Sequence, residues 1–144
     1  MIDPAALQKY SLFGGLVQDQ IEAIRPLLGQ LNYAAGELIM KEGEPNDRIC
    51  FILEGWVVVS KKERLLVELG EGETFGEMEL LDVQPAVATI RALVPTKVAT
   101  ISNRALHKIY KKDVQIFSLM VMNLARDLSR RLRHMDDLHS QAEV

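Results

Sequence analysis

The residues best suited to bind a ligand gather in one stretch, FGEMELLDVQPAVATIRA, at positions 75–92. Gly76 would let the main chain come close to a bound molecule, and the start of a following helix would offer free N–H groups to an anion. The carboxylate of Glu77 could accept hydrogen bonds from a ribose hydroxyl. A tight strand-to-helix turn with a capping carboxylate explains the same residues without a ligand. Taken alone, these few residues favour that simpler explanation.

No other group of residues has a catalytic or metal-binding pattern. His134 and His139 are five positions apart, so they do not share a helical face, and the adjacent Asp136 and Asp137 point apart on a helix. The one cysteine, Cys50, lies in an apolar run, where a buried and unreactive thiol is expected. We therefore predict no catalytic residue, no metal site and no cofactor, and we expect the protein not to be an enzyme.

Length and composition are those of one globular domain. The chain has 144 residues, of which 48% are hydrophobic and 26% charged, which is enough to bury a core. Its net charge of −3 argues against nucleic acid as an obligatory partner. The first residues, MIDPAALQKY, lack the pattern of a signal peptide. No stretch approaches the roughly 20 apolar residues of a membrane-spanning helix, so we expect a cytoplasmic protein without membrane contact.

The elements that must position the 75–92 stretch begin with two helices within residues 3–30. Asp3–Pro4 favours a short first helix, which Gly14–Gly15 should end. The second helix, over 18–28, contains Pro26, which should kink or shorten it.

Antiparallel strands are expected over residues 34–102, because short apolar runs alternate there with glycine- or charge-bearing turns. Strands of this length and spacing are typical of a barrel, roll or sandwich. Ser102 or Asn103 can then cap a helix to about Lys111. The order of helices, strands and helices predicts an α+β fold in a single domain. The expected strands are Leu38–Met40, Ile49–Leu53, Trp56–Ser60, Leu65–Leu69, Val87–Ala92 and Val98–Ile101.

Several pieces of the sequence, in order along the chain, resemble the cyclic nucleotide-binding domains of bacterial cAMP receptor proteins, protein kinase regulatory subunits and cyclic nucleotide-gated channels. The resemblance runs from about Ser11 to His139, and four turn glycines stand where that family's β-roll needs them. The pieces are SLFGGL at 11–16, AAGELIMKEGEPNDRICFILEGWVVV at 34–59 and LVELGEGETFGEMELL at 66–81, and the glycines are Gly36, Gly43, Gly55 and Gly72.

The resemblance implies both a fold and a function. The fold is an antiparallel β-roll of the jelly-roll or double-stranded β-helix type over 34–102, flanked by N-terminal helices and by C-terminal helices over 103–139, all in one domain over 1–144. The function is that of a regulatory sensor whose ligand is held by the phosphate-binding cassette at 75–92. Glu77 would bind the ribose, and main-chain N–H groups would hold the phosphate. The ligand-binding residues implied are Phe75, Gly76, Glu77, Met78, Leu80, Pro85, Ala86 and Val87.

Two positions of the cassette depart from the family's pattern. The arginine that should follow Pro85 and pair with the cyclic phosphate is Ala86, and the small residue two places after Glu77 is Glu79. A charge-assisted hydrogen bond contributes about 1.5–3 kcal/mol, so the two changes together should lower affinity by about two orders of magnitude or more. Arg91 is an odd number of strand positions from Ala86 and should face the opposite side. We expect cAMP or cGMP to bind weakly.

The longest element is a helix that Asp113 can cap and that reaches about His139. Its positions follow a heptad with one polar exception, and its second half projects beyond one β-roll, which favours a homodimer through this helix. Only six residues follow Leu138, too few for the helix-turn-helix of transcription-factor relatives, so no direct DNA binding is expected. The predicted dimer residues are Phe117, Val121, Leu124, Leu128, Arg131, Met135 and Leu138.

Two functions follow from these residues. In the first, the domain senses a cyclic nucleotide or a related nucleotide, and the ligand changes the packing of the C-terminal helices; Gly76, Glu77 and Pro85 favour it. In the second, a degenerate domain has lost nucleotide binding and serves as a dimerisation or protein-interaction module; Glu79 and Ala86 favour that alternative.

Overall fold

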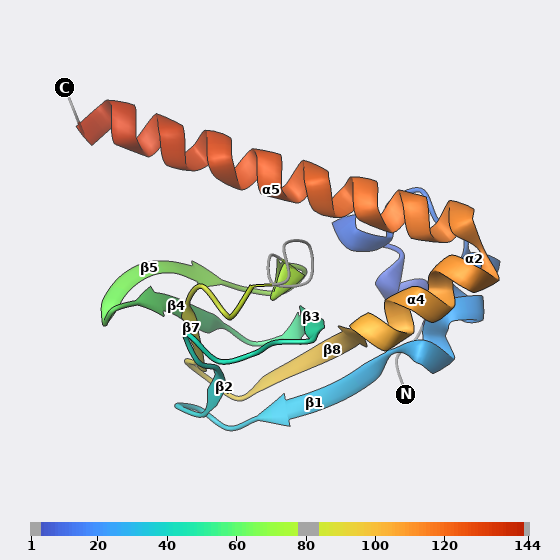
Figure 1. Ribbon diagram of the computed structural model, residues 1–144, viewed down its shortest axis with the longest axis horizontal. Coiled ribbons are helices and arrows are strands. Elements are labelled where there is room, and N and C mark those ends of the chain that lie inside the picture. The colour runs from blue at the N-terminus through green and yellow to red at the C-terminus, as the bar shows by residue number, and fades with distance from the viewer. Residues whose placement is uncertain (1–3, 78–83, 143–144) are drawn as a thin grey trace.

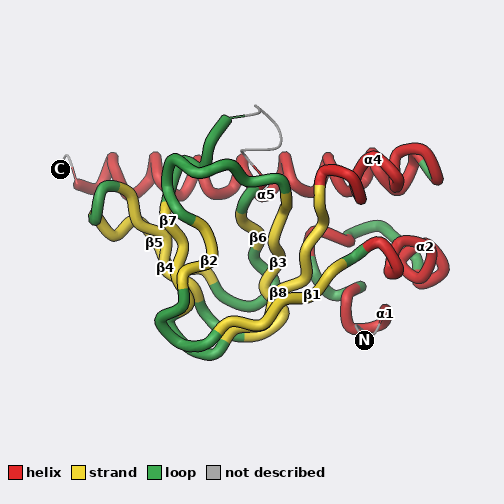
Figure 2. The backbone as a smooth tube through the Cα atoms, turned by 60° about the horizontal axis from the view of Figure 1, so that its bottom comes forward, coloured by secondary structure: helices red, strands yellow, loops and turns green. Residues whose placement is uncertain are grey.

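Two four-stranded antiparallel sheets face each other and form the β-roll of an α+β domain, as the sequence predicts (Figures 1 and 2). The computed structural model describes the backbone of residues 4–77 and 84–142, and the side chains of residues 6–77 and 84–134. One sheet has the strand order β1-β8-β3-β6 and the other β2-β7-β4-β5. The strands are β1 (Gly29–Tyr33), β2 (Leu38–Met40), β3 (Arg48–Glu54), β4 (Val57–Lys61), β5 (Arg64–Leu69), β6 (Thr74–Phe75), β7 (Thr89–Ala92) and β8 (Thr96–Ser102).

Helices gather at one end of the roll, and the longest of them runs along it (Figure 1). They are α1 (Pro4–Leu7), the 3-10 turn η1 (Ser11–Phe13), α2 (Gln18–Ile24), the 3-10 turn η2 (Arg25–Leu27), α4 (Asn103–Lys112) and α5 (Val114–Ala142). The predicted caps are confirmed: the Ser102 hydroxyl accepts from the N–H of Ala105 at 3.0 Å, and the Asp113 carboxylate accepts from the N–H of Gln115 at 2.9 Å.

The N-terminal helices and two strands differ from the sequence-based prediction. The expected first helix is broken, because α1 ends at Leu7 and a separate 3-10 turn follows. The second is shortened as predicted, since Pro26 lies in a 3-10 turn after α2. The first sheet begins at Gly29 and not at residue 34, because β1 is a mostly exposed edge strand without an apolar alternation. The two-residue β6 is too short to leave a pattern.

Strand β3 separates two hydrophobic cores, which explains its continuous apolar run. Ile49 and Phe51 point to one side, into a core with the N-terminal helices, α4 and α5. Cys50 and Ile52 point to the other side, into the interior of the roll. Successive strand residues face opposite sides of a sheet, so a strand buried on both faces shows no polar alternation.

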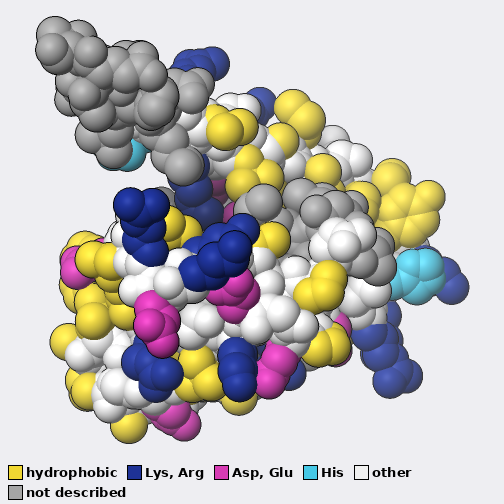
Figure 3. Space-filling model, turned by 60° about the vertical axis from the view of Figure 1, so that its left-hand side comes forward, with side chains coloured by type: hydrophobic (Ala, Val, Ile, Leu, Met, Phe, Trp, Pro, Cys, Tyr) yellow, Lys and Arg dark blue, Asp and Glu magenta, His cyan; other side chains and the backbone are white. Residues whose placement is uncertain are grey.

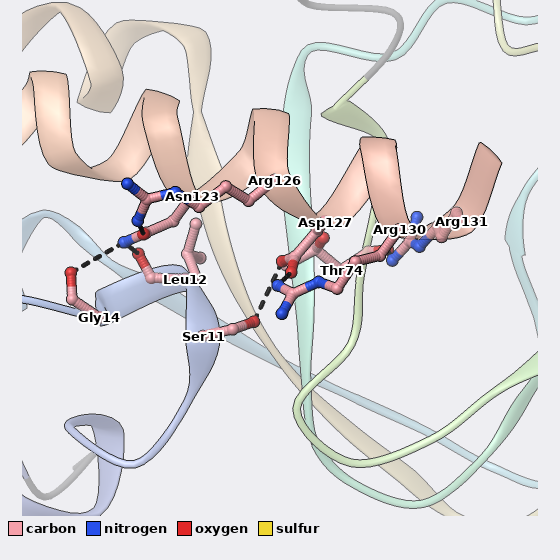
Figure 4. Close-up of polar contacts among 9 residues, drawn as sticks. All are labelled: Ser11, Leu12, Gly14, Thr74, Asn123, Arg126, Asp127, Arg130 and Arg131. Carbon is pink, nitrogen blue, oxygen red and sulfur yellow. Dashed lines mark hydrogen bonds and ion pairs between the residues drawn. The ribbon is translucent and has the colours of Figure 1, made fainter. Parts of the chain in front are cut away.

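The first half of α5 is fixed to the N-terminal segment by polar contacts of Asn123 and Asp127 (Figure 4). The amide of Asn123, which is 4% exposed, donates hydrogen bonds to the carbonyls of Leu12 at 3.0 Å and Gly14 at 2.9 Å. One turn further along, the Ser11 hydroxyl donates to the carboxylate of Asp127 at 3.0 Å. Because these contacts cross between distant parts of the chain, they set the position of α5 relative to the roll.

Candidate functional site

Gly76 follows β6 at a point where no side chain fits. Its φ of +86° lies in the left-handed region, and a Cβ atom there would lie 2.6 Å from the carbonyl oxygen of Arg48 and 2.9 Å from the amide nitrogen of Asn46. The same amide donates to the carbonyls of Gly76 at 3.1 Å and Arg48 at 2.9 Å. The close approach of Arg48 and the hydrogen bond from Asn46 hold the turn that precedes Glu77, and this turn requires glycine at position 76.

Glu77 is buried and paired with an arginine of α5. Its side chain is 4% exposed, and its Oε1 lies 3.1 Å from Nη1 of Arg131. The other terminal nitrogen of Arg131 donates to the carbonyl of Thr74 at 2.5 Å, and Figure 4 shows this arginine reaching from the helix toward Thr74. The guanidinium thus joins α5 to both ends of the turn that contains Gly76.

The Thr74 hydroxyl, one residue before the end of β6, is buried and has no hydrogen-bond partner within the described part of the chain. The side chain is 1% exposed. A buried hydroxyl without a partner costs free energy, and this one lies next to the carbonyl of the same residue, which accepts from Arg131.

The second end of the predicted cassette is held from the main chain. The N–H of Ala86 donates to the carbonyl of Glu44, and the Ala86 carbonyl accepts from the N–H of Gly43, both at 2.9 Å. Its methyl group is 3% exposed and packs in the apolar interior of the roll with Phe75. Pro85 and Val87 on either side are exposed.

Arg91 does not take the place of the missing arginine, as the strand alternation predicted. It is exposed on β7, and its guanidinium donates to the carbonyl of Gly36 at 2.8 Å. Ala88, Ile90 and Ala92 of the same stretch are buried. The odd spacing from Ala86 therefore does direct Arg91 to the outer side of the sheet.

The loop between β2 and β3, residues 41–47, connects both ends of the predicted cassette. It bonds the main chain of Ala86 through Gly43 and Glu44, and it contacts Gly76 through Asn46. Through this loop, the segment Phe75–Glu77 is connected to the segment Pro85–Val87. Met78, Glu79 and Leu80, also predicted to lie at the site, fall outside the described residues.

An apolar surface on β5 is a feature that the sequence analysis did not assign to the site. Val67 lies on the same face of the strand as the buried Leu69, yet it is 46% exposed. A bulge pairs Leu65 with Ser60 and not with Val59, so Leu65, which is 64% exposed, lies on the opposite face. Val67 pairs with Val59 of β4, which packs against the interior core. On the face of the molecule that carries the β4–β5 hairpin, hydrophobic side chains reach the surface between charged ones (Figure 3).

Glu77 also borders a groove of about 250 Å³ between α4 and α5. Three of the predicted dimer residues, Phe117, Val121 and Leu124, line this groove, and Leu124 is part of the core of its own chain. Leu128 is partly buried, and Arg131 contacts Glu77. The side chains of Met135 and Leu138 lie outside the described ones. The two-chain seam stays a prediction, and Arg131, which the heptad pattern placed in that seam, contacts Glu77 and Thr74 of its own chain.

Cys50 is buried in the interior of the roll, as the sequence predicted. Burial raises the pKa of its thiol from 9.0 to about 12, which keeps the thiol protonated and unreactive at neutral pH. Among the described residues, no three His, Cys, Asp or Glu side chains are grouped to bind a metal ion. No helix in the described ranges is both long and apolar enough to span a membrane.

Comparison with known proteins matches this architecture to one domain family. The family model described as the cyclic nucleotide-binding domain matches residues 30–113. A CRP-like cAMP-activated global transcriptional regulator of Mycobacterium tuberculosis is 26% identical over 137 residues, which cover 92% of this chain and 61% of the relative. A cyclic nucleotide-gated potassium channel of Rhizobium etli is 36% identical over 110 residues, which cover 76% of this chain and 28% of the channel. The chain therefore spans less than two thirds of the length of these relatives.

Solved structures agree with the sequence relatives. The catabolite activator protein of Thermus thermophilus has a TM-score of 0.77 at 29% identity, over 90% of this chain and 63% of that protein. A cyclic nucleotide-binding domain from Methylobacillus flagellatus has a TM-score of 0.82 at 24% identity, over 92% of this chain and 78% of that one. At that identity the second match shows the fold alone.

Proposed function

The chain belongs to the cyclic nucleotide-binding domain family, and from that premise we propose that it is a sensor that binds a nucleotide-type ligand in the β-roll and signals through α5. The observation that carries the proposal is the contact between Glu77 and Arg131. It connects the residue implied as the ribose partner to the C-terminal helix at 3.1 Å. A binding site and an output element joined by one ion pair can influence each other directly.

The ligand would lie between the cassette and the exposed Val67 of β5. Its ribose hydroxyls would donate to the Glu77 carboxylate, and its base would cover Val67, which shares a face of the strand with the buried Leu69. Phe75, Gly76, Pro85, Ala86 and Val87, with Met78 and Leu80, would form the rest of the site. Covering the exposed part of the Val67 side chain with the flat face of a base is favourable by about 25 cal/mol per Å² of apolar surface buried, and this gain supports weak binding without a phosphate arginine.

Signalling would begin when the ligand changes the Glu77–Arg131 contact. The first half of α5 is held by Asn123 and Asp127, so it keeps its position. Beyond Asp127, the side-chain hydrogen bonds that the structure describes from α5 to the roll are those of Arg131 to Glu77 and Thr74. A hydroxyl that takes over an oxygen of Glu77 would weaken this hold and let the distal half of the helix repack. Such population shifts require only a difference in ligand affinity between the two states.

The alternative is a degenerate domain that no longer binds cAMP or cGMP and acts as a dimerisation or protein-interaction module. The observation that favours it is the buried methyl group of Ala86, which occupies the position of the phosphate arginine without offering a charge. Loss of that arginine weakens the binding of an anion, but it leaves Glu77, the implied ribose partner, and the exposed Val67 of β5 in place.

We also propose that α5 pairs with its copy in a homodimer. Leu132 is 62% exposed, and it lies on the helix face next to Leu128 and Val121, since residues four and eleven positions apart share a face. Burying these side chains against a second copy would remove an apolar strip from water. In this role the domain binds and regulates, has no catalytic function, and acts in the cytoplasm.

Calorimetric titration tests the sensor function. The purified protein is titrated with cAMP, cGMP, cyclic dinucleotides and the parent nucleosides, alongside Glu77→Gln. The matched control is Glu68→Gln, at an exposed carboxylate of β5. We expect binding at micromolar or weaker affinity that Glu77→Gln abolishes and Glu68→Gln leaves intact. No binding of any of these compounds would favour the degenerate alternative.

A further inference from the structure

The exposed face of α4 is strongly basic. Over Asn103–Lys112 the helix contains four lysines and arginines and no acidic residue. Three of them, Arg104, Lys108 and Lys111, are exposed and share one helical face, because they are four and three positions apart. Ile109 on the opposite face is buried in the core. The whole chain has a net charge of −3, so this concentration of positive charge, the α4 basic face, is local.

This arrangement of charges is unfavourable for the helix itself. Like charges three or four positions apart, as in Arg104–Lys108 and Lys108–Lys111, repel each other. Arg104 lies in the first turn, where the positive end of the helix dipole disfavours a cation. The dipole favours Lys111 and Lys112 in the last turn, and the Lys112 ammonium also donates to the carbonyl of Ala23 at 3.0 Å. The fold therefore explains the cations at the end of α4, but not Arg104 and Lys108.

No acidic side chain in the described part of the protein pairs with the α4 basic face. Arg104, Lys108 and Lys111 form none of the ion pairs found among the described residues. Those ion pairs are formed by other basic residues, namely Lys9, Arg48, Arg130 and Arg131. The three cations are therefore available to negatively charged groups from another molecule.

An aromatic pair borders the α4 basic face. Tyr110 is 50% exposed, and its ring stacks on that of His107 with the ring centroids 6.5 Å apart. The edge contact with Phe117 of α5, at a centroid distance of 5.2 Å, fixes the position of the Tyr110 ring. An exposed ring held in this way offers apolar contact area at a low cost in conformational entropy. The surface thus combines three cations with one rigid aromatic edge.

Acidic residues limit this surface on two sides. Asp47, whose side chain is 78% exposed, lies at the start of α4, because its carbonyl accepts from the N–H of Asn103 at 2.7 Å. The exposed Glu22 of α2 precedes Ala23, to which Lys112 is bonded. Between them, the 10 residues of α4 span only about 15 Å. A nucleic acid duplex or a membrane would present its negative charge to these acids as well, whereas a short peptide segment would not.

From the basic face, its aromatic edge and its acidic borders, we propose that α4 binds a short acidic segment of a partner protein. The acidic side chains pair with Arg104, Lys108 and Lys111, and an apolar side chain packs on Tyr110. Helix α4 lies at the opposite end of the roll from the β4–β5 hairpin (Figure 1), and none of these residues belongs to the cassette. The surface does not depend on a nucleotide ligand, so it is compatible with a sensor and with a degenerate domain alike.

The test is the binding of a fluorescent peptide to the full chain, followed by anisotropy. The peptide has about eight residues, with one central phenylalanine and with glutamate at alternate positions, which share one side of an extended chain. We expect it to bind at least about tenfold more tightly than a control peptide with glutamine in place of glutamate, and more weakly as salt is added. Alanine in place of the phenylalanine should weaken binding by about threefold or more.

A pair of protein variants locates the site. Arg104→Gln combined with Lys108→Gln should weaken binding of the acidic peptide by about fivefold or more. The control, Lys61→Gln combined with Lys62→Gln, removes the same charge from the exposed β4–β5 hairpin and should change the affinity by less than about twofold, because distant charges are screened. Thermal unfolding is measured for both variants. The α4 variant should unfold at the temperature of the unmodified protein or above it, since repulsion between like charges is relieved.

Three results would overturn the proposal. The first is equal binding of the acidic peptide to the α4 variant and to the hairpin variant. The second is tighter binding of a DNA duplex or of phosphatidylserine vesicles than of the peptide, lost in the same α4 variant, since the partner would then be a nucleic acid or a membrane. The third is a lower unfolding temperature for the α4 variant than for the hairpin variant, which would show that the two cations stabilise their own helix.

Discussion

Arg131 in α5 and Glu77 after β6 form an ion pair at 3.1 Å across 54 positions of sequence. The carboxylate is almost fully buried, whereas a third of the arginine side chain is exposed. A pair of this kind adds less to stability than its geometry suggests, but removal of one partner leaves a charge buried alone. The pair therefore connects the cassette to α5, and its net contribution to the free energy of unfolding is small.

Arg131→Met should destabilise the protein by about 1–3 kcal/mol, because it leaves the Glu77 carboxylate buried without the guanidinium. Arg130→Met, one position earlier, removes an exposed arginine paired with Asp127 and should cost less than about 0.5 kcal/mol. Urea denaturation measures both. The double variant Arg131→Met, Glu77→Gln should recover part of the loss. Equal effects of the two arginine substitutions would show that the buried pair has no special role.

Gly76→Ala should cost about 2–4 kcal/mol, since a Cβ there meets the Arg48 carbonyl oxygen at 2.6 Å in addition to the left-handed backbone. Gly36 has nearly the same φ, but nothing lies within 4 Å of a Cβ placed on it. Gly36→Ala should therefore cost only the backbone term of about 1–2 kcal/mol. Thermal unfolding compares the two. If Gly36→Ala is as damaging as Gly76→Ala, the close approach at Gly76 is not what requires glycine there.

Asn123→Ala should destabilise the protein by about 1–3 kcal/mol, because the carbonyls of Leu12 and Gly14 lose their donor inside the protein. Ser129→Ala on the exposed side of the same helix should stay within about 0.5 kcal/mol of the unmodified protein. Both are followed by chemical denaturation. A neutral Asn123→Ala would mean that packing alone positions α5.

Leu132→Arg should weaken self-association by about tenfold or more, since it places a charge on the apolar face proposed to pair with a second copy. Lys111→Glu, which changes a charge on the exposed side of α4, is the control and should leave association unchanged. Sedimentation equilibrium measures both. A monomeric unmodified protein at high micromolar concentration would rule out the homodimer.

The fold could be predicted from sequence wherever burial leaves a pattern. The six apolar runs correspond to β2, β3, β4, β5, β7 and β8, and the caps at Ser102 and Asp113 start α4 and α5. Strand β1 was missed because an exposed edge strand carries no such pattern. Strand β6 was missed because it has only two residues, which are extended because they pair with β3. Local sequence cannot reveal an element that exists only through its neighbours.

The candidate site was predictable only where a family pattern exists. Gly76, Glu77, Pro85 and Ala86 come from the cassette motif. Arg131 was assigned to a dimer seam by its heptad position, since a heptad describes spacing and not the direction of one long side chain toward a distant carboxylate. Its contact with Glu77 became visible only with the fold.

Hydrogen–deuterium exchange of α5 tests the central claim most directly. Exchange of residues 128–134 is measured with and without a saturating amount of the tightest-binding ligand, adenosine, guanosine, cAMP or cGMP, while residues 116–124 serve as the internal reference. The coupling of Glu77 to Arg131 predicts a ligand-dependent change of exchange in residues 128–134 and little change in the half anchored by Asn123. A saturated site with unchanged exchange along the whole of α5 would contradict it.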